Sequence, residues 1–279
     1  MMVKFIRLIN FEMNRLIKFL LPATLLMIIF EIIGTFSAVN NYNNWANDLL
    51  MEQPDNLNNV IQNLGSFSFH NVTNNGFFNI GILIIVILFI FYSFFTWYRD
   101  WLGKNTFAYR LLMLPMNRLS IFFSKAIVFV IAGLFFYGLQ YILFLIIPTL
   151  VEATITNQFL LDMNIYDYFS ENNFFSLLFP NTVTEFLAIY GFAFGALLAL
   201  FTGIIMERSY NWKGLIFGLL YFVAYFFLYS FISLLPYFFP LSITMPPSPI
   251  FIWQQIYIVS TLIISTLLSG YLLNQKIKI

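Results

Sequence analysis

The stretch FFNIGILIIVILFIFYSFFTWY, residues 77–98, decides the class of fold. It contains no charged residue and is long enough to cross the hydrocarbon core of a bilayer as one helix, which takes about 20 apolar residues. Five further stretches are also long enough and mostly apolar, and the charged residues inside them are Glu31 in the first span and Glu185 in the fourth. The sequence therefore predicts an all-α polytopic membrane protein with six transmembrane helices, at residues 19–38, 77–98, 126–150, 184–206, 215–235 and 250–273.

The composition supports this class and excludes several others. Of the 279 residues, 61% are hydrophobic and 9% are charged, whereas roughly 25% of a soluble domain is charged. We therefore expect a single transmembrane domain over residues 1–279. The net charge of +1 gives no reason to expect a nucleic-acid partner. The absence of cysteine excludes disulfides and thiolate metal sites, and a single histidine argues against any other metal site.

The lysine and arginine residues predict the orientation. All 13 of them lie before the first span, between the second and third, between the fourth and fifth, or after the sixth. The loops at residues 40–75 and 151–183 contain acidic residues but no lysine or arginine. Because basic segments remain in the cytoplasm, both termini and the loop at 99–125 are predicted to be cytoplasmic.

Two segments outside the spans have their own pattern. Residues 1–18 predict an amphipathic helix in the lipid headgroup region, with Lys4, Arg7 and Lys18 on its polar face and a bend at Pro22. The alternative is a basic flank that only sets topology. Residues 236–250 are proline-rich, and we expect a short external or re-entrant element there.

The loop at 99–125 predicts a short helix parallel to the membrane. Gly103 ends the preceding span, Thr106 can cap a new helix, and Pro115 stops it near Leu114. Its apolar side chains would hold it against the bundle, while the basic ones would face the cytosol. The first group is Phe107, Leu111, Leu112 and Leu114, and the second is Lys104, Arg110 and Arg118. The alternative is an ordinary turn whose basic residues only enforce orientation.

Gly103, the pattern Leu-Leu-x-Leu-Pro at 111–115, and then Arg118, Ile121 and Lys125 resemble the first cytoplasmic loop of type-2 ABC-exporter permeases. The nearest in character are the small exporters of phenol-soluble modulins and the permeases of bacteriocin self-immunity. The resemblance implies that this loop is the coupling helix, which contacts a dimer of ABC ATPase subunits. The implied contact residues are Thr106, Phe107, Arg110, Leu111, Leu114, Pro115 and Arg118.

The resemblance also implies the rest of the assembly. ATP and magnesium would bind the partner ATPase, since this chain has no phosphate-binding motif and no cofactor or catalytic residue of its own. A second copy or a sister permease would complete the exporter in a bacterial cell membrane. The cargo would be an amphipathic peptide or a lipid-like molecule. In related exporters the second and fifth spans border the route, which here points to Tyr92, Tyr221, Tyr225 and Tyr229; the alternative is bulk that faces membrane lipids.

Two features inside the spans are unusual. Glu31 would carry a charge into the first span, so we expect it to line the route or, alternatively, to bond a polar neighbour such as Gln140. The fourth span carries a stripe of small residues at four-residue spacing, which lets another helix approach closely, either within the chain or across a dimer seam. The stripe is Gly191, Gly195, Ala199 and Gly203.

Two other classes of function compete with export. An intramembrane enzyme needs several His, Cys, Asp or Glu side chains that converge at membrane depth, and the spans offer essentially Glu31 alone. A membrane scaffold or immunity protein that binds a peptide without transporting it is the stronger alternative. It would need no coupling helix.

Overall fold

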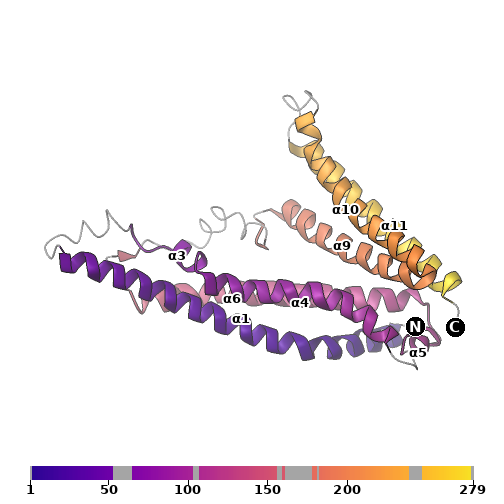
Figure 1. Ribbon diagram of the computed structural model, residues 1–279, viewed down its shortest axis with the longest axis horizontal. Helices are drawn as coiled ribbons and strands as arrows, with labels where there is room; N and C mark the ends of the chain where they lie inside the picture. The colour runs from indigo at the N-terminus through magenta and orange to yellow at the C-terminus, as the bar shows by residue number, and fades with distance from the viewer. Residues whose placement is uncertain are drawn as a thin grey trace. The chain divides into compact units, whose positions relative to one another are not determined.

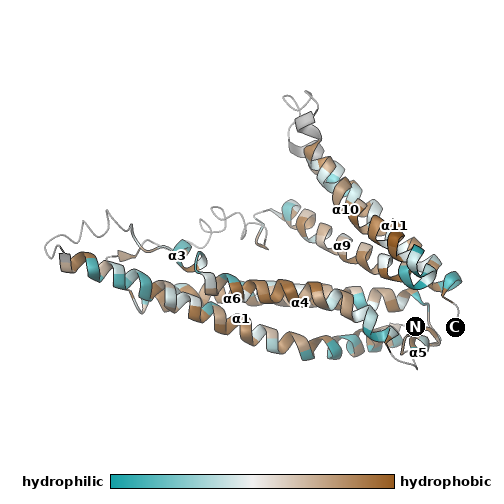
Figure 2. Ribbon diagram, viewed as in Figure 1, coloured by the Kyte–Doolittle hydropathy of each residue, from teal (hydrophilic) through white to brown (hydrophobic). Residues whose placement is uncertain are grey.

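The computed structural model describes residues 2–52, 65–102, 107–155, 159–160, 178–180, 182–238 and 247–277. Six of its helices are long and apolar enough to cross a membrane, which confirms an all-helical, multi-pass membrane protein. Figure 2 shows hydrophobic residues along all the long helices. These helices are α1 (Met2–Glu52), α4 (Gly76–Trp101), α6 (Leu119–Glu152), α9 (Val183–Tyr210), α10 (Trp212–Phe238) and α11 (Pro247–Tyr271) (Figure 1).

Three short helices complete the described chain: α3 (Phe69–Thr73), α5 (Phe107–Leu112) and the π-helix η3 (Leu272–Lys276). Extended pairing is limited, within the described residues, to one isolated bridge between Phe67 and Leu160. The fold is therefore built almost entirely from helix packing.

The expected separation of residues 1–18 from the first span is wrong. α1 is one helix from Met2 to Glu52 and continues through Pro22. A proline removes only one helical hydrogen bond, and helices in membranes tolerate that loss when the turns on both sides stay intact. At about 1.5 Å per residue the helix is about 75 Å long, more than twice the roughly 30 Å hydrocarbon core. Much of α1 therefore lies outside that core.

The proline-rich segment at 236–250 is described only at its two ends. Pro236 lies inside α10, which ends at Phe238, and α11 begins at Pro247. Proline fits the first turn of a helix because its missing N–H has no partner there. Residues 239–246 lie outside the described residues, so a re-entrant segment stays a prediction only for them.

By its internal contacts the chain divides into two compact units, and the single transmembrane domain expected over residues 1–279 stays a prediction. Unit 1 contains Met1–Leu16, Ile90–Ile131 and Pro180–Ile279, and unit 2 contains Ile17–Phe89 and Ala132–Phe179. Three helices, α1, α4 and α6, contribute residues to both units. The division therefore does not separate two independent stretches of sequence.

In unit 1, α9, α10 and α11 pack against one another (Figure 1). The small-residue stripe of α9 faces this contact. Ala199 is fully buried, and a methyl group at Gly203 would lie 3.1 Å from the carbonyl oxygen of Gly218 on α10. At Gly195 the same addition would meet the ring of Tyr225, and Gly191 faces Ile258 of α11. The stripe thus packs against helices of the same chain in unit 1, and its use as a dimer seam stays a prediction.

In unit 2, aromatic rings form the core. Phe144 of α6 packs edge-on against Phe69, stacks on Phe78 of α4, and also contacts Phe179. Helices α1 and α4 touch at their backbones, because a methyl group at Gly34 would lie 2.6 Å from the nitrogen of Phe78. This close approach leaves no room for any side chain at Gly34.

Candidate functional site

The segment of residues 107–118, called the α5 loop below, presents two different sides. Its inner side is apolar and buried, and consists of Ala108, Leu111 and Leu112. Its outer side joins one cation to apolar groups, and we call it the exposed α5 face: Tyr109, Arg110, Met113, Leu114 and Pro115. A short helix held by one side and open on the other is suited to bind a partner protein.

The residues predicted to contact a partner divide accordingly. Arg110 and Pro115 are exposed, as such a contact requires. Leu111 is 6% exposed and packs inward, so it does not lie on the exposed α5 face, and its contact with a partner stays a prediction. Leu114 was expected to hold the helix, but it is 41% exposed because α5 ends at Leu112 and the chain turns away. Thr106 lies outside the described residues.

Phe107 attaches the α5 loop to α1. Its ring stacks on Phe11 with 5.6 Å between centroids. The guanidinium carbon of Arg15 lies 4.4 Å from the Phe11 centroid and 4.8 Å from that of Phe107. Each cation–π contact of this kind contributes about 0.5–1 kcal/mol at partly exposed sites. Phe107 is therefore half-buried against α1 and is not fully available to a partner.

A group of five charged side chains, three of them buried and two half-buried, lies next to this attachment, and we call it the charge cluster: Glu12, Arg15, Arg99, Asp100 and Lys125. Lys125 of α6 donates to Glu12 Oε1 at 2.9 Å, to Asp100 Oδ2 at 2.5 Å and to the carbonyl oxygen of Thr96 at 3.0 Å. An ammonium group has three hydrogens to donate, so Lys125 is fully satisfied. It lies 5.3 Å from the Trp97 ring centroid.

The two arginines complete the charge cluster. Arg15 donates to Asp100 Oδ1 at 2.8 Å, and Arg99 donates to Glu12 Oε2 at 3.3 Å. The side chains of Glu12, Asp100 and Lys125 are only 1–2% exposed. Three cations and two anions thus join α1, α4 and α6 within unit 1, and the charges are hydrogen-bonded as burial requires.

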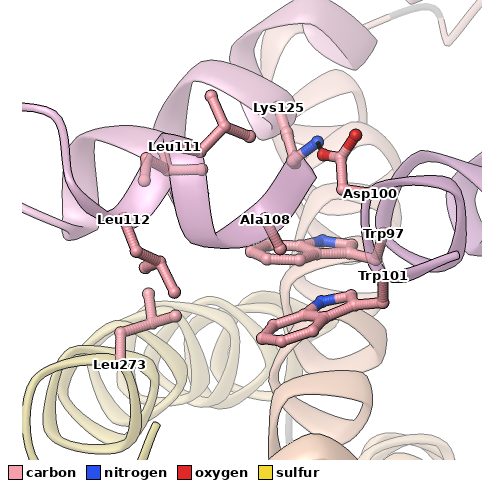
Figure 3. Close-up of a pocket in the computed structure, with 9 residues that line it drawn as sticks. Trp97, Asp100, Trp101, Ala108, Leu111, Leu112, Lys125 and Leu273 are labelled. Carbon is pink, nitrogen blue, oxygen red and sulfur yellow. Dashed lines mark hydrogen bonds and ion pairs between the residues drawn. The ribbon is translucent and has the colours of Figure 1, made fainter. Parts of the chain in front are cut away.

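A small pocket separates the charge cluster from the α5 loop (Figure 3). In the figure the Lys125 ammonium points toward the Asp100 carboxylate, while Trp97 and Trp101 lie along one wall. The pocket holds about 10 Å³, roughly the space of one water molecule. It is therefore a packing gap and cannot hold a peptide or a lipid.

Arg118 was predicted to face the cytosol, but its guanidinium group instead turns toward backbone carbonyls. Its Nη1 donates to the carbonyl oxygens of Leu273 at 2.5 Å and of Ile277 at 3.3 Å, at the C-terminal end of the chain. Carbonyls in the last turn of a helix lack intrahelical partners, and a basic side chain nearby satisfies them. Arg118 thus fastens η3 to the start of α6.

Replacing Arg118 with glutamine should release η3. Because both carbonyls lose a charged donor, we expect amide hydrogens of residues 272–277 to exchange several-fold faster with deuterium, equivalent to about 1–2 kcal/mol of local stability. Hydrogen exchange followed by mass spectrometry measures this. Arg110→Gln is the matched control, since Arg110 is exposed. Equal exchange in both variants would contradict the role given to Arg118.

The predicted route tyrosines are engaged inside unit 1. Tyr225 is 3% exposed and donates to the Phe192 carbonyl at 2.7 Å, and Tyr221 shares a hydrogen bond of 2.7 Å with Ser265. Tyr229 packs on the ring of Phe192, with 4.2 Å between centroids. These three residues join α10 to α9 and α11. Tyr92 is 1% exposed and accepts from Arg99 at 3.3 Å, which links it to the charge cluster.

Glu31 is fully buried in unit 2. Gln140 Nε2 donates to its Oε2 at 3.2 Å, so the hydrogen bond offered as the alternative to a route role is present. A role in the route stays a prediction.

Sequence reasoning missed the charge cluster. Glu12 was not singled out, Arg15 and Arg99 were interpreted only as basic residues that set topology, and Lys125 only as part of the basic loop and of its resemblance to exporter permeases. The spacing of Glu12 could have indicated its burial. It lies four residues after Leu8 and four before Leu16, on the buried face of α1. The cluster explains why this face carries a carboxylate.

Among the described residues, no three His, Asp or Glu side chains are grouped so as to hold a metal ion. Comparisons of the chain with protein-family models, curated proteins and solved structures give no match. The functional argument therefore depends on the chain's own geometry.

Proposed function

We propose that this chain is the membrane-spanning permease subunit of an ATP-driven exporter in a bacterial cell membrane. The observation that carries the proposal is the α5 loop, whose inner side is buried while the exposed α5 face remains open. The location of all lysines and arginines at one end of the spans supports a cytoplasmic position for this loop and for both termini. There a soluble ATPase can reach it.

The connections of the α5 loop support a mechanical role. The loop follows α4 and precedes α6, and Phe107 attaches it to α1. The charge cluster joins these same three helices close to the loop. A force applied to the exposed α5 face would therefore move three spans together. ATP and magnesium would act on the partner ATPase dimer, and this chain would supply the path.

The start of α1 fits the same orientation. Lys4, Arg7 and Lys18 are exposed along a helix that is far longer than the bilayer core. We place these first turns at the cytoplasmic headgroups, where cations meet lipid phosphates. A second copy or a sister permease would complete the assembly. The cargo would be an amphipathic peptide or a lipid-like molecule, because the spans offer aromatic and hydroxyl groups and few charges.

Purification of the tagged chain from native membranes in mild detergent should recover an ATPase. In vesicles that contain both subunits, Arg110→Glu should lower transport-coupled ATPase activity about tenfold or more, since a reversed charge at a docking surface costs a few kcal/mol. Lys213→Glu is the matched control, because Lys213 is also exposed and lies in another basic segment. It should leave the activity unchanged.

Two results would reject the proposal. The first is purification without any ATPase under conditions that keep known exporters intact. The second is unchanged ATPase activity and transport in Arg110→Glu. Peptide binding that persists without transport would favour the scaffold or immunity function instead.

A further inference from the structure

Glu31 occupies a closed position between three helices of unit 2. It belongs to α1, has no exposed surface, and meets α6 through Gln140. On the α4 side a methyl group at Gly81 would lie 3.1 Å from Glu31 Cγ and 3.0 Å from the Met27 carbonyl oxygen. Helix α4 thus passes so close to Glu31 that even a methyl group at Gly81 would require its neighbours to move.

The carboxyl group has too few partners for a charge. Oε2 accepts one hydrogen bond from a neutral amide, and Oε1 is buried without a partner among the described residues. No ion pair in the described part of the chain includes Glu31. An ionised carboxylate in such a position loses its hydration and gains no compensating cation.

The surrounding helices do not supply a hidden charge. The part of α4 in unit 2, residues 76–89, contains no ionisable side chain. On α6 the ionisable neighbours of Gln140 are Tyr137 and Tyr141, whose rings pack against Phe179. Near Glu31 on α1, Thr35 donates its hydroxyl to the Glu31 backbone carbonyl rather than to the carboxyl group.

We propose that Glu31 is a proton-binding site: it holds a proton while α1, α4 and α6 are packed, and it releases the proton when water enters between them. The proton removes the charge that the closed position cannot stabilise, and the neutral acid keeps its hydrogen bond from Gln140. Opening this part of unit 2 is then linked to proton release. This inference does not depend on the export function.

Infrared difference spectroscopy tests the bound proton directly. The spectrum of the full chain in detergent at neutral pH, minus that of Glu31→Gln, should contain the C=O stretch of one carboxylic acid. Gln140→Leu should shift this band, because the carbonyl loses its hydrogen bond. Glu185→Gln is the control: Glu185 is exposed, and its difference spectrum should show a carboxylate. A carboxylate band for Glu31 would overturn the proposal.

Stability against pH gives a second measurement. If the packed state binds one more proton than the open state, the unfolding constant of the wild type should rise about tenfold per pH unit relative to Glu31→Gln, within the range where only the open state is ionised. Glutamine cannot ionise and preserves the shape, so the variant lacks this dependence. Parallel curves for the two proteins would overturn the proposal.

Discussion

Replacing Lys125 with methionine should lower the free energy of unfolding of the full chain in detergent by about 3–5 kcal/mol, the cost of leaving a buried ion pair without one partner. Lys125 donates to a carboxylate on each side, Glu12 and Asp100. Methionine fills a similar volume but leaves those two oxygens without their donor. Arg15 and Arg99 would still bind the opposite oxygens, so the structure loses part of the cluster rather than all of it.

The double variant Asp100→Asn/Lys125→Met separates charge from packing. It removes the nearest pair together, so its destabilisation should be smaller than the sum of the two single changes, with a coupling of about 1–3 kcal/mol. Lys18→Met is the matched control, because Lys18 is an exposed cation on α1 and should change stability by less than about 0.5 kcal/mol. Strict additivity would show that the 2.5 Å contact between Lys125 and Asp100 carries no net interaction.

If the export function holds, Lys125→Met chains that still fold should also couple ATP hydrolysis to transport less efficiently. The cluster joins the three helices to which the α5 loop is connected, so loosening it would let the exposed α5 face move without the spans. ATPase activity would then persist while transport falls. This pattern differs from that of Arg110→Glu, in which the partner would no longer bind.

The spans were predictable because the bilayer imposes a single demand. A segment such as residues 77–98 carries no charge, and lipid offers no hydrogen bonds to its backbone N–H and C=O groups. It must therefore satisfy these groups internally, as a helix. Its observed helix, Gly76–Trp101, differs by only a few residues. The same constraint explains why the helix ends predicted at the prolines were wrong. Pro22 and Pro236 end helices in water, but in these spans the helix continues past both of them.

The candidate site was predictable only where local sequence decides it. The turn pattern around Pro115 predicted the short helix α5, and the exposure of Arg110 follows from its place on that helix. The orientation of the Arg118 side chain depends on the carbonyl oxygens of Leu273 and Ile277, which lie more than 150 residues away in the sequence. Local pattern carries no information about such a partner.

The charge cluster shows the same limit. Lys125 lies 113 residues from Glu12 and 25 from Asp100, and near the end of a span a lysine is ordinarily interpreted as a topology signal. Only the helical register of Glu12 indicated that one charge turns inward. Pairing charges across three helices requires knowing which faces meet, and that is decided by tertiary packing.

Replacing Gly218 with alanine should separate α9 from α10 and destabilise the chain by about 1–3 kcal/mol or more, because overpacking a close helix contact forces backbone shifts. A Cβ at Gly218 would lie 2.5 Å from the carbonyl oxygen of Gly203 and 2.9 Å from its Cα. Both atoms belong to the backbone, so no side chain can rotate to relieve the clash. Leucine at the same position should prevent assembly of the folded chain.

Gly138→Ala is the control that makes this prediction sharp. Gly138 lies inside α6, and a methyl group there would meet nothing within 4 Å. The same substitution should be neutral or should stabilise the helix by about 0.5–1 kcal/mol, because alanine restricts the unfolded chain. Thermal unfolding in one detergent compares the two variants. If Gly218→Ala behaves like Gly138→Ala, the helices do not meet at Gly203, and packing by the small-residue stripe would have to be abandoned. A loss confined to Gly218→Ala would show that α10 is held to α9 by direct backbone contact, which in a membrane replaces the hydrophobic effect as the force between helices.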